Sequence, residues 1–200
     1  TPAWLSTVKG TVTKVVFDAS FKYVKPIKCL NWFRECGKLA TVANIGNFNT
    51  SEVTTMQQMF RDCTSLTSLN LSTFNTQKVT TMRSMFYGCT GLTSLTLSSF
   101  NTAAITNMGY MFFNCSKLTS IDVSKFNTAN VTAMDGLFYG CSGLTSLDLT
   151  NFNTAKVTTI KDMFRVCSKL TSIDLSSFNT AAVTDMTSVF FGCSGLTSLD

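Results

Sequence analysis

The chain has 200 residues, of which 44% are hydrophobic and 14% charged, with a formal net charge of +5. It has no histidine, and its only glutamates are Glu35 and Glu52, so the commonest general base and transition-metal ligand is missing. No P-loop, EF-hand, dinucleotide-binding or G-x-S-x-G motif occurs. The composition therefore predicts a protein that is not an enzyme and that uses no cofactor.

The positive charge is concentrated at the N-terminal end. Residues 1–40 carry seven basic and two acidic side chains, whereas basic and acidic residues are equal in number over residues 41–200. Such an end either forms a solvated surface or contacts an acidic partner. No Arg-rich run with interleaved aromatics is present, so we expect no nucleic acid to bind. No apolar run of 18 residues occurs, so we expect no membrane span.

Residues 1–31 are predicted to form a degenerate N-terminal capping segment. Within them, the stretch TKVVFDASF, which ends at Phe21, resembles an irregular strand followed by a turn. Cys29 lies at the end of this segment and Cys36 shortly after it. These two thiols are either bonded to each other or buried separately, because both fit apolar positions.

Residues 32–200 are a tandem array of 26-residue repeats. The period is set by six cysteines, each 26 residues after the one before: Cys63, Cys89, Cys115, Cys141, Cys167 and Cys193. A fixed period in this range is typical of a solenoid, in which each repeat packs only on its neighbours. The sequence ends inside a predicted strand, so we expect the array to continue beyond residue 200. An uncapped last coil would also allow end-to-end self-association.

Each repeat divides into two halves of different periodicity. In Leu66–Phe74 the pattern is L-x-x-L-x-L-x-x-F, and its centre alternates with period two, which predicts a short strand. Val79, Met82, Met85, Phe86 and Cys89 follow at spacings that fit one face of a short helix. The predicted fold is an α/β solenoid. It is a leucine-rich-repeat-like right-handed coil with short parallel strands on one face and short helices on the other.

Two columns of the repeat are predicted to fill the interior. The phenylalanine that ends each strand pattern should form a ladder of stacked rings, made by Phe48, Phe74, Phe100, Phe126, Phe152 and Phe178. The six in-phase cysteines should form a ladder of buried free thiols, because their Cβ vectors run parallel rather than toward each other.

A variable column beside the helical face is the candidate ligand-binding surface. It is made by the residue after the repeated Met-Phe pair: Arg61, Tyr87, Phe113, Tyr139, Arg165 and Phe191. Tyr and Arg are common hot-spot residues in interfaces, so the row is a candidate contact strip. The alternative is that the rings lie flat over neighbouring coils and only complete the packing.

An acidic column on the strand face offers a second candidate. It contains Asp122, Asp148, Asp174 and Asp200. Carboxylates about 5 Å apart could share a calcium ion, or they could form a solvated acidic stripe.

The repeated text MFYGC-S-G-L-T-S-L-D-L-S-x-F-N-T-x-x-V-T-x-M resembles the 26-residue repeat of BspA-like leucine-rich repeat surface proteins of bacteria. The opening VVFDASF…KPIKCLNWFREC resembles the segment that introduces such arrays. The departures are Leu137, Ile160 and Val189 at methionine positions and one residue inserted before Phe48. The resemblance implies an exported or surface-displayed protein involved in adhesion, and it carries over no binding residue.

The favoured function is a secreted, non-enzymatic binding module at the bacterial cell surface. Its partner would be a protein or glycan on a host or neighbouring cell. The alternative is a structural stalk whose repeats project another domain. The constant serines of the strand face favour a stalk, whereas the variable column of Arg, Tyr and Phe favours a binding surface.

Overall fold

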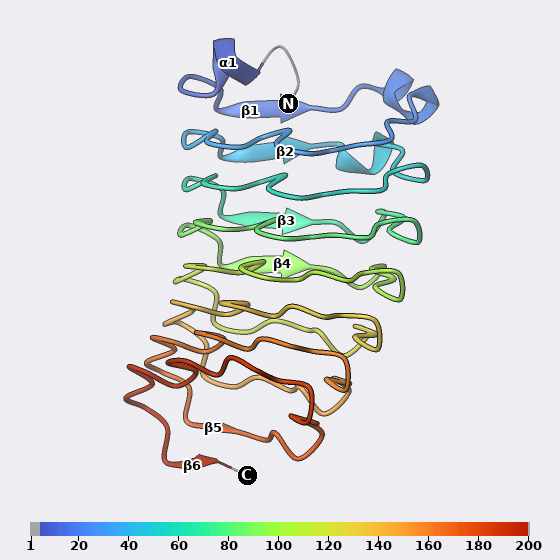
Figure 1. The fold of residues 1–200 in the computed structure, drawn as a ribbon. Helices are drawn as coiled ribbons and strands as arrows, with labels where there is room; N and C mark the ends of the chain where they lie inside the picture. The colour runs from blue at the N-terminus through green and yellow to red at the C-terminus, as the bar shows by residue number, and fades with distance from the viewer. Residues whose placement is uncertain (1–4, 200) are drawn as a thin grey trace.

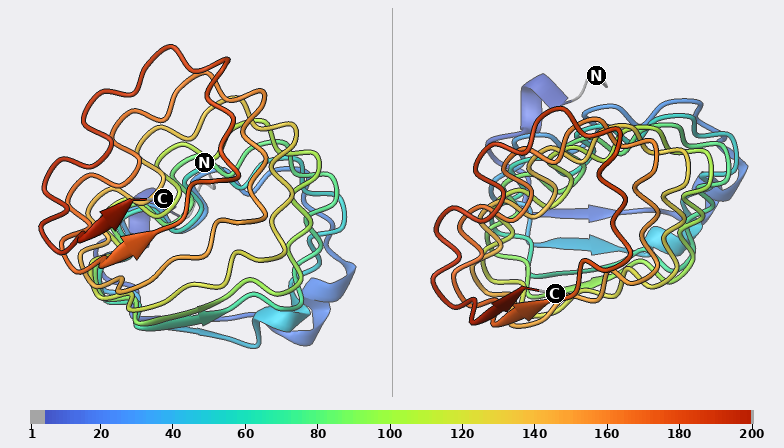
Figure 2. Two further views of the ribbon diagram at one scale, coloured as in Figure 1. Left: turned by 90° about the horizontal axis from the view of Figure 1, so that it is seen from below. Right: turned by 60° about the horizontal axis from the view of Figure 1, so that its bottom comes forward.

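The computed structural model describes residues 5–199, which form a stack of coils with the N-terminus at one end and the C-terminus at the other (Figure 1). Seen along the stack, successive coils follow similar closed outlines, each shifted relative to the one before (Figure 2). Because one repeat completes one coil, equivalent residues of successive repeats lie one above another. The predicted leucine-rich-repeat-like solenoid is confirmed.

The N-terminal part forms the first layers of this stack. Helix α1, Leu5–Val8, precedes strand β1, Lys14–Val16, and the 3₁₀ turn η1, Ala19–Tyr23. Strand β1 pairs in parallel with β2, Thr41–Ala43, and the 3₁₀ turn η2, Ile45–Asn47, follows. The irregular strand predicted before Phe21 is therefore present.

Short parallel strands form one face, as predicted. Strand β3, Ser68–Asn70, pairs with β4, Ser94–Thr96, and β5, Ser172–Ile173, pairs with β6, Ser198–Leu199. In β3 the central Leu69 is buried while both its neighbours are exposed. The period-two pattern therefore placed Leu69 inside correctly, whereas the equivalent Leu95 is only partly buried and Leu199 is exposed.

The predicted helical face is wrong. Over residues 32–199 the only helical element is the 3₁₀ turn η2, and the Met-Phe segments are runs of tight turns. The N–H of Met59 donates to the C=O of Met56, three residues back, at 3.2 Å. The N–H of Phe60 instead donates to the C=O of Met85 in the next coil, at 2.9 Å. An α-helix would need every N–H for i→i−4 bonds, so this exchange with the next coil excludes it.

Two left-handed residues in each repeat produce these turns. In one coil they are Gln58, with φ 56°, and Asp62, with φ 59°, placed on either side of Met59, Phe60 and Arg61. Their equivalents in later coils are Ser84 and Gly88, Tyr110 and Asn114, Gly136 and Gly140, Asp162 and Val166, and Ser188 and Gly192. A residue with positive φ ends a helical turn, so the chain reverses twice within each Met-Phe segment.

A second parallel ladder joins the coils just before the turns. Isolated parallel bridges connect seven successive layers, at Lys28, Thr55, Thr81, Asn107, Ala133, Thr159 and Asp185. The solenoid is thus hydrogen-bonded between coils on this side as well as through the strands.

The ladder of stacked rings forms from a different column than predicted. The phenylalanines of the Met-Phe pair stack along the interior, with centroids of Phe86 and Phe112 5.8 Å apart and planes 6° apart. Equivalent stacking runs from Phe33 to Phe190. The predicted column is buried from Phe48 to Phe152, and Phe178 is partly buried. Within residues 5–199 its only mutual ring contact is the edge-on pair Phe48–Phe74, at 5.8 Å.

Buried polar groups also repeat in register. Each in-phase thiol donates to the carbonyl of a phenylalanine in the preceding coil; the Sγ of Cys115, for example, lies 3.3 Å from the O of Phe86. All eight cysteines are free, which confirms the thiol ladder and shows Cys29 and Cys36 unbonded. The hydroxyl of the buried Thr102 donates to the O of Asn127 at 2.9 Å and accepts from its N–H at 2.7 Å.

Candidate functional site

The predicted surface column is one continuous stack of side chains. The rings of Tyr87 and Phe113 lie 4.2 Å apart with planes 1° apart, and Phe113 and Tyr139 lie 4.3 Å apart. The guanidinium of Arg61 lies 4.4 Å from the centroid of Tyr87 at one end. Arg165 lies 5.7 Å from Tyr139 at the other end. We call these five residues the aromatic row.

The same column continues beyond the aromatic row to the last predicted member, Phe191. The guanidinium of Arg165 is 4.4 Å from the ring of Phe191, which is 62% exposed. The three central rings are partly buried. Their faces therefore contact each other and the two arginines, while their edges reach solvent. The rings pack on one another across coils, as the packing alternative predicts, and they also form surface. That this surface contacts a ligand stays a prediction.

The turns explain why these side chains point outward. Arg61 lies between the buried Phe60 and the left-handed Asp62, so the chain reverses directly after it. The N–H of Asp62 donates to the O of Tyr87 at 2.6 Å, which fixes the next coil beneath this position. The same turn recurs every 26 residues, so the row has the spacing of the coils.

A hollow of about 350 Å³ lies beside the N-terminal half of the row. It is lined by three predicted residues, Arg61, Tyr87 and Phe113, and by four that the sequence analysis did not select: Gln58, Arg83, Ser84 and Tyr110. Arg83 and Tyr110 were missed because each occurs once in its column, so no repeated pattern marks them. The available signal was the opposite charge of Arg83 and Asp135, which stand two repeats apart.

Arg83 is held by an ion pair that crosses one coil. Its Nη1 lies 3.2 Å from Oδ2 of Asp135, and its guanidinium lies 4.7 Å from the ring centroid of Tyr110. Gly109 separates the two charged groups, and a Cβ there would lie 2.6 Å from each of them. Gly136 likewise leaves room for the ring of Tyr110, which lies 2.5 Å from the place of a Cβ. These two glycines make the arrangement sterically allowed.

The hydroxyl of Tyr110 stays protonated to a higher pH than usual. Burial raises the pKa of Tyr110, and the neighbouring carboxylate of Asp135 raises it further. At neutral pH this side chain is therefore an uncharged hydroxyl beside Arg83.

The thiols lie away from this surface and are chemically quiet. Burial raises the pKa of Cys29 to about 12 and that of Cys36 to about 11. Thiolate is the reactive form, so these groups react slowly at neutral pH. Among residues 5–199, no three His, Cys, Asp or Glu side chains are grouped so that they could hold a metal ion.

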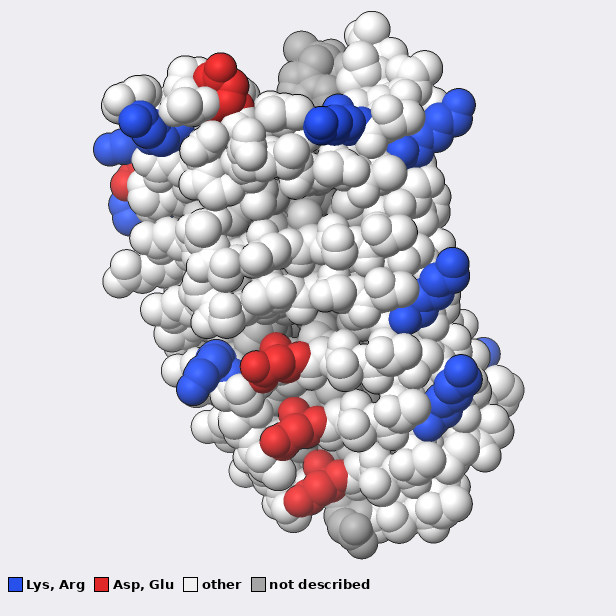
Figure 3. Space-filling view, turned by 180° about the vertical axis from the view of Figure 1, so that it is seen from behind, with Lys and Arg blue, Asp and Glu red and all other residues white. Residues whose placement is uncertain are grey.

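The acidic column lies on the strand face, where acidic side chains stand one above another (Figure 3). Each carboxylate accepts a hydrogen bond from the N–H two residues later, as Asp148 does from Thr150 at 3.0 Å. These hydrogen bonds lower the pKa of Asp122, Asp148 and Asp174. The carboxylates therefore complete local turns, and calcium binding there stays a hypothesis. Asp200 lies outside the described residues.

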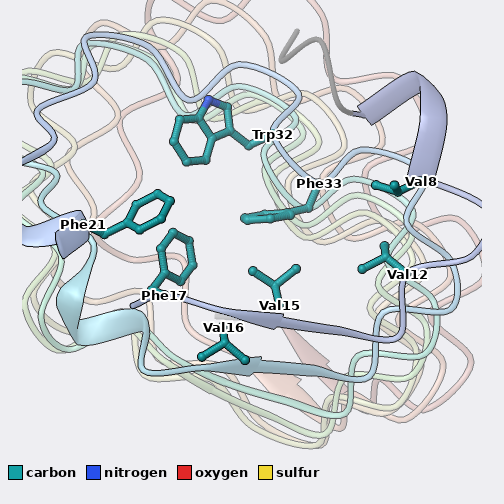
Figure 4. A pocket seen from close by; sticks show the side chains of 8 residues that line it. All are labelled: Val8, Val12, Val15, Val16, Phe17, Phe21, Trp32 and Phe33. Carbon is teal, nitrogen blue, oxygen red and sulfur yellow. The ribbon is translucent and has the colours of Figure 1, made fainter. Parts of the chain in front are cut away.

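An apolar pocket of about 270 Å³ opens at the N-terminal end of the stack (Figure 4). Valines of α1, β1 and the segment between them line one side, and Phe17, Phe21, Trp32 and Phe33 line the rest. Sequence analysis did not identify this pocket.

The helices within residues 5–199 are all too short or too polar to span a membrane.

Residues 27–120 and 114–199 match the family described as "Mycoplasma protein of unknown function, DUF285". The chain belongs to this family. No curated protein is similar enough to this DUF285 chain to count as a match.

Solved bacterial structures resemble the DUF285 chain at low identity. A leucine-rich repeat protein from Eubacterium ventriosum is 23% identical, with a TM-score of 0.48, over 72% of this chain and 34% of that one. A leucine rich cell surface protein from Faecalibacterium prausnitzii is 18% identical, with a TM-score of 0.48, over 95% and 48%. A leucine-rich repeat protein of T. pallidum is 18% identical, with a TM-score of 0.42, over 94% and 79%. This chain spans about a third of the first protein and about half of the second.

Proposed function

We propose that this chain is a non-enzymatic binding module of a bacterial surface protein, and that the aromatic row is its contact surface. The observation that carries the proposal is the stack itself: three partly exposed rings in face-to-face contact, with an arginine at each end. Aromatic and Arg side chains are enriched in protein interfaces, where they bury a large area.

The row is also well ordered before any partner binds. The rings hold one another, and the coils beneath them are joined by backbone hydrogen bonds such as Phe86 N–H to Met111 O, at 2.9 Å. A contact surface that is already ordered loses less conformational entropy on binding. An extended, rigid row of this kind suits a partner that lies across several coils.

The extracellular location and the role in adhesion belong to the proposal as well. They are supported by the likeness of the repeat to those of BspA-like surface proteins. The partner would be a protein or glycan on a host or neighbouring cell.

A different class of function is a stalk that projects another domain. It is favoured by the constant exposed serines of the strand face: Ser68, Ser94, Ser120, Ser146 and Ser172.

The proposal is tested with the double variant Tyr87→Leu/Tyr139→Leu. Leucine keeps apolar cover on both sides of Phe113 but removes the ring edges and the hydroxyls. We expect capture of proteins from a solubilised extracellular-matrix preparation to fall at least tenfold, a loss of about 1.4 kcal/mol or more. Tyr23→Leu is the matched control, because Tyr23 is 75% exposed and lies outside the row.

Thermal melting of the same proteins separates binding from packing. If the double variant unfolds at a much lower temperature than the control, the rings serve the fold and the contact proposal fails. If capture is the same for both variants and the unsubstituted chain, the stalk is favoured instead.

A further inference from the structure

The hollow beside the aromatic row combines two cations with no acid. Both Arg61 and Arg83 line it, and none of its seven lining residues is Asp or Glu. Each arginine does have a carboxylate partner, Asp62 for the first and Asp135 for the second. Since neither carboxylate lines the hollow, the guanidiniums are held from outside it.

Most of the hydrogen-bond donors of these arginines are unused. A guanidinium carries five N–H groups. Arg61 gives its Nε–H to Asp62 at 3.1 Å, and Arg83 gives Nη1 to Asp135 at 3.2 and 3.4 Å. Within the described part of the chain, neither Nη1 nor Nη2 of Arg61 makes a hydrogen bond, and Nη2 of Arg83 makes none either. These donors remain for a ligand.

The aromatic walls of the hollow also favour negative charge. The guanidinium of Arg61 covers one face of Tyr87, and Phe113 covers the other. Tyr110 has the guanidinium of Arg83 over its ring. The edge of an aromatic ring carries partial positive charge. With both of its faces in contact with other groups, Tyr87 presents its edge to the hollow, which complements an anion.

We propose that this hollow binds the carboxylate of an Asp or Glu side chain on a protein partner. A planar carboxylate accepts two parallel N–H donors from a guanidinium, and two arginines at one hollow provide such donors. The volume is at the lower end for ligand pockets, so it suits one side chain rather than a long segment. A sugar would stack on an open ring face, and both faces of Tyr87 are taken. The occupant is therefore an acidic side chain of a protein rather than a glycan.

This inference rests on the proposed function, because it assigns the chemistry of the partner that the row contacts. The two are tested separately. The contact proposal is measured with matrix proteins and Tyr-to-Leu variants, and the carboxylate site with a defined peptide and Arg variants. Binding of the peptide without binding of matrix proteins would leave the site in place and remove the adhesion proposal.

The probe is a fluorescent hexaglutamate peptide, with hexaglutamine as its neutral match, followed by fluorescence anisotropy. We expect hexaglutamate alone to bind. We expect Arg61→Gln and the pair Arg83→Gln/Asp135→Asn each to weaken it at least fivefold. The double variant Arg83→Gln/Asp135→Asn, called the pair variant below, removes both members of the ion pair. It therefore leaves no unpaired carboxylate and does not change the net charge. The matched control is Lys78→Gln/Glu52→Gln, which removes another ion pair of 2.6 Å with the same charge balance and should change binding less than twofold.

Three results would overturn the site. These are equal binding of hexaglutamine, unchanged binding by both Arg variants, and a control that weakens binding as much as they do. Tighter binding of a glucuronate hexasaccharide than of hexaglutamate would reject the protein partner in favour of a glycan. If the pair variant does not fold, Arg61→Gln decides alone, because its partner Asp62 has a side chain 36% exposed and stays solvated.

Discussion

At the scale of single residues, two phenylalanine columns are equally buried but contact different neighbours. Phe112 is fully buried between the rings of Phe86 and Phe138, at 5.8 and 5.5 Å. Phe126 is 3% exposed and makes no ring contact within residues 5–199. Sequence alone could not separate these columns, because both are invariant phenylalanines in apolar surroundings. What separates the two columns in the structure is ring contact between successive coils, which only the Phe112 column makes throughout.

This difference predicts unequal effects of the same substitution. Phe112→Leu removes two stacked contacts, each worth about 0.5–1.5 kcal/mol beyond the buried area. Phe126→Leu removes only buried area. We therefore expect Phe112→Leu to lower the free energy of unfolding by about 1–3 kcal/mol more than Phe126→Leu, measured by urea denaturation. Equal losses would mean that stacking adds nothing to burial here.

At the scale of elements, the repeat period was sufficient to predict the strands but not the turns. Alternation in Leu66–Phe74 has one interpretation, and β3 follows it. The equivalent residues 120–122 and 146–148 form no assigned strand. The three-residue steps from Val79 to Met82 to Met85, and from Phe86 to Cys89, have two interpretations, since both a helix and successive tight turns bring every third residue inside. The missed signal was the left-handed column, where Gly88 and its equivalents are often Gly, Asn or Asp, residues that tolerate positive φ.

The same reasoning limits what could be predicted for the site. The row was predictable because a fixed period places equivalent residues one above another. The hollow was not predictable from the repeat. Arg83, Gly109 and Asp135 occupy one column, but they differ in residue type from coil to coil. Their relation depends on a side chain that reaches across a whole coil, over a glycine. Repeat periodicity contains no information about that reach.

The left-handed column contains one poorly suited residue, which gives a prediction at this scale. Val166 has φ 62°, although β-branched residues strongly avoid this region. The equivalent Asn114 has φ 55°. We expect Val166→Asn to raise the free energy of unfolding by about 1 kcal/mol by relieving backbone strain. Val157→Asn is the control: Val157 is fully buried, so this variant should be clearly destabilised. A melting temperature that falls for Val166→Asn would contradict the strain argument.

At the scale of the whole molecule, stability depends on position along the stack. Each coil packs only on its neighbours, so burial can differ from coil to coil. The interior residues of the coil around Phe112 are fully buried, whereas Phe178, Val183 and Phe190 are only partly buried. The thiol column shows the same decrease in burial along the stack, because Cys115 is buried and Cys193 is partly exposed.

This gradient predicts the order in which the thiols react. Burial raises the pKa of Cys193, and it raises that of Cys115 much further above the usual value. At pH 8 the native chain should therefore be alkylated by iodoacetamide first at Cys193, with Cys115 at least tenfold slower, as followed by peptide mass spectrometry. In urea all eight thiols should react at similar rates, because every cysteine is free and burial is lost. Equal native rates would mean that the stack opens as one unit rather than from its end.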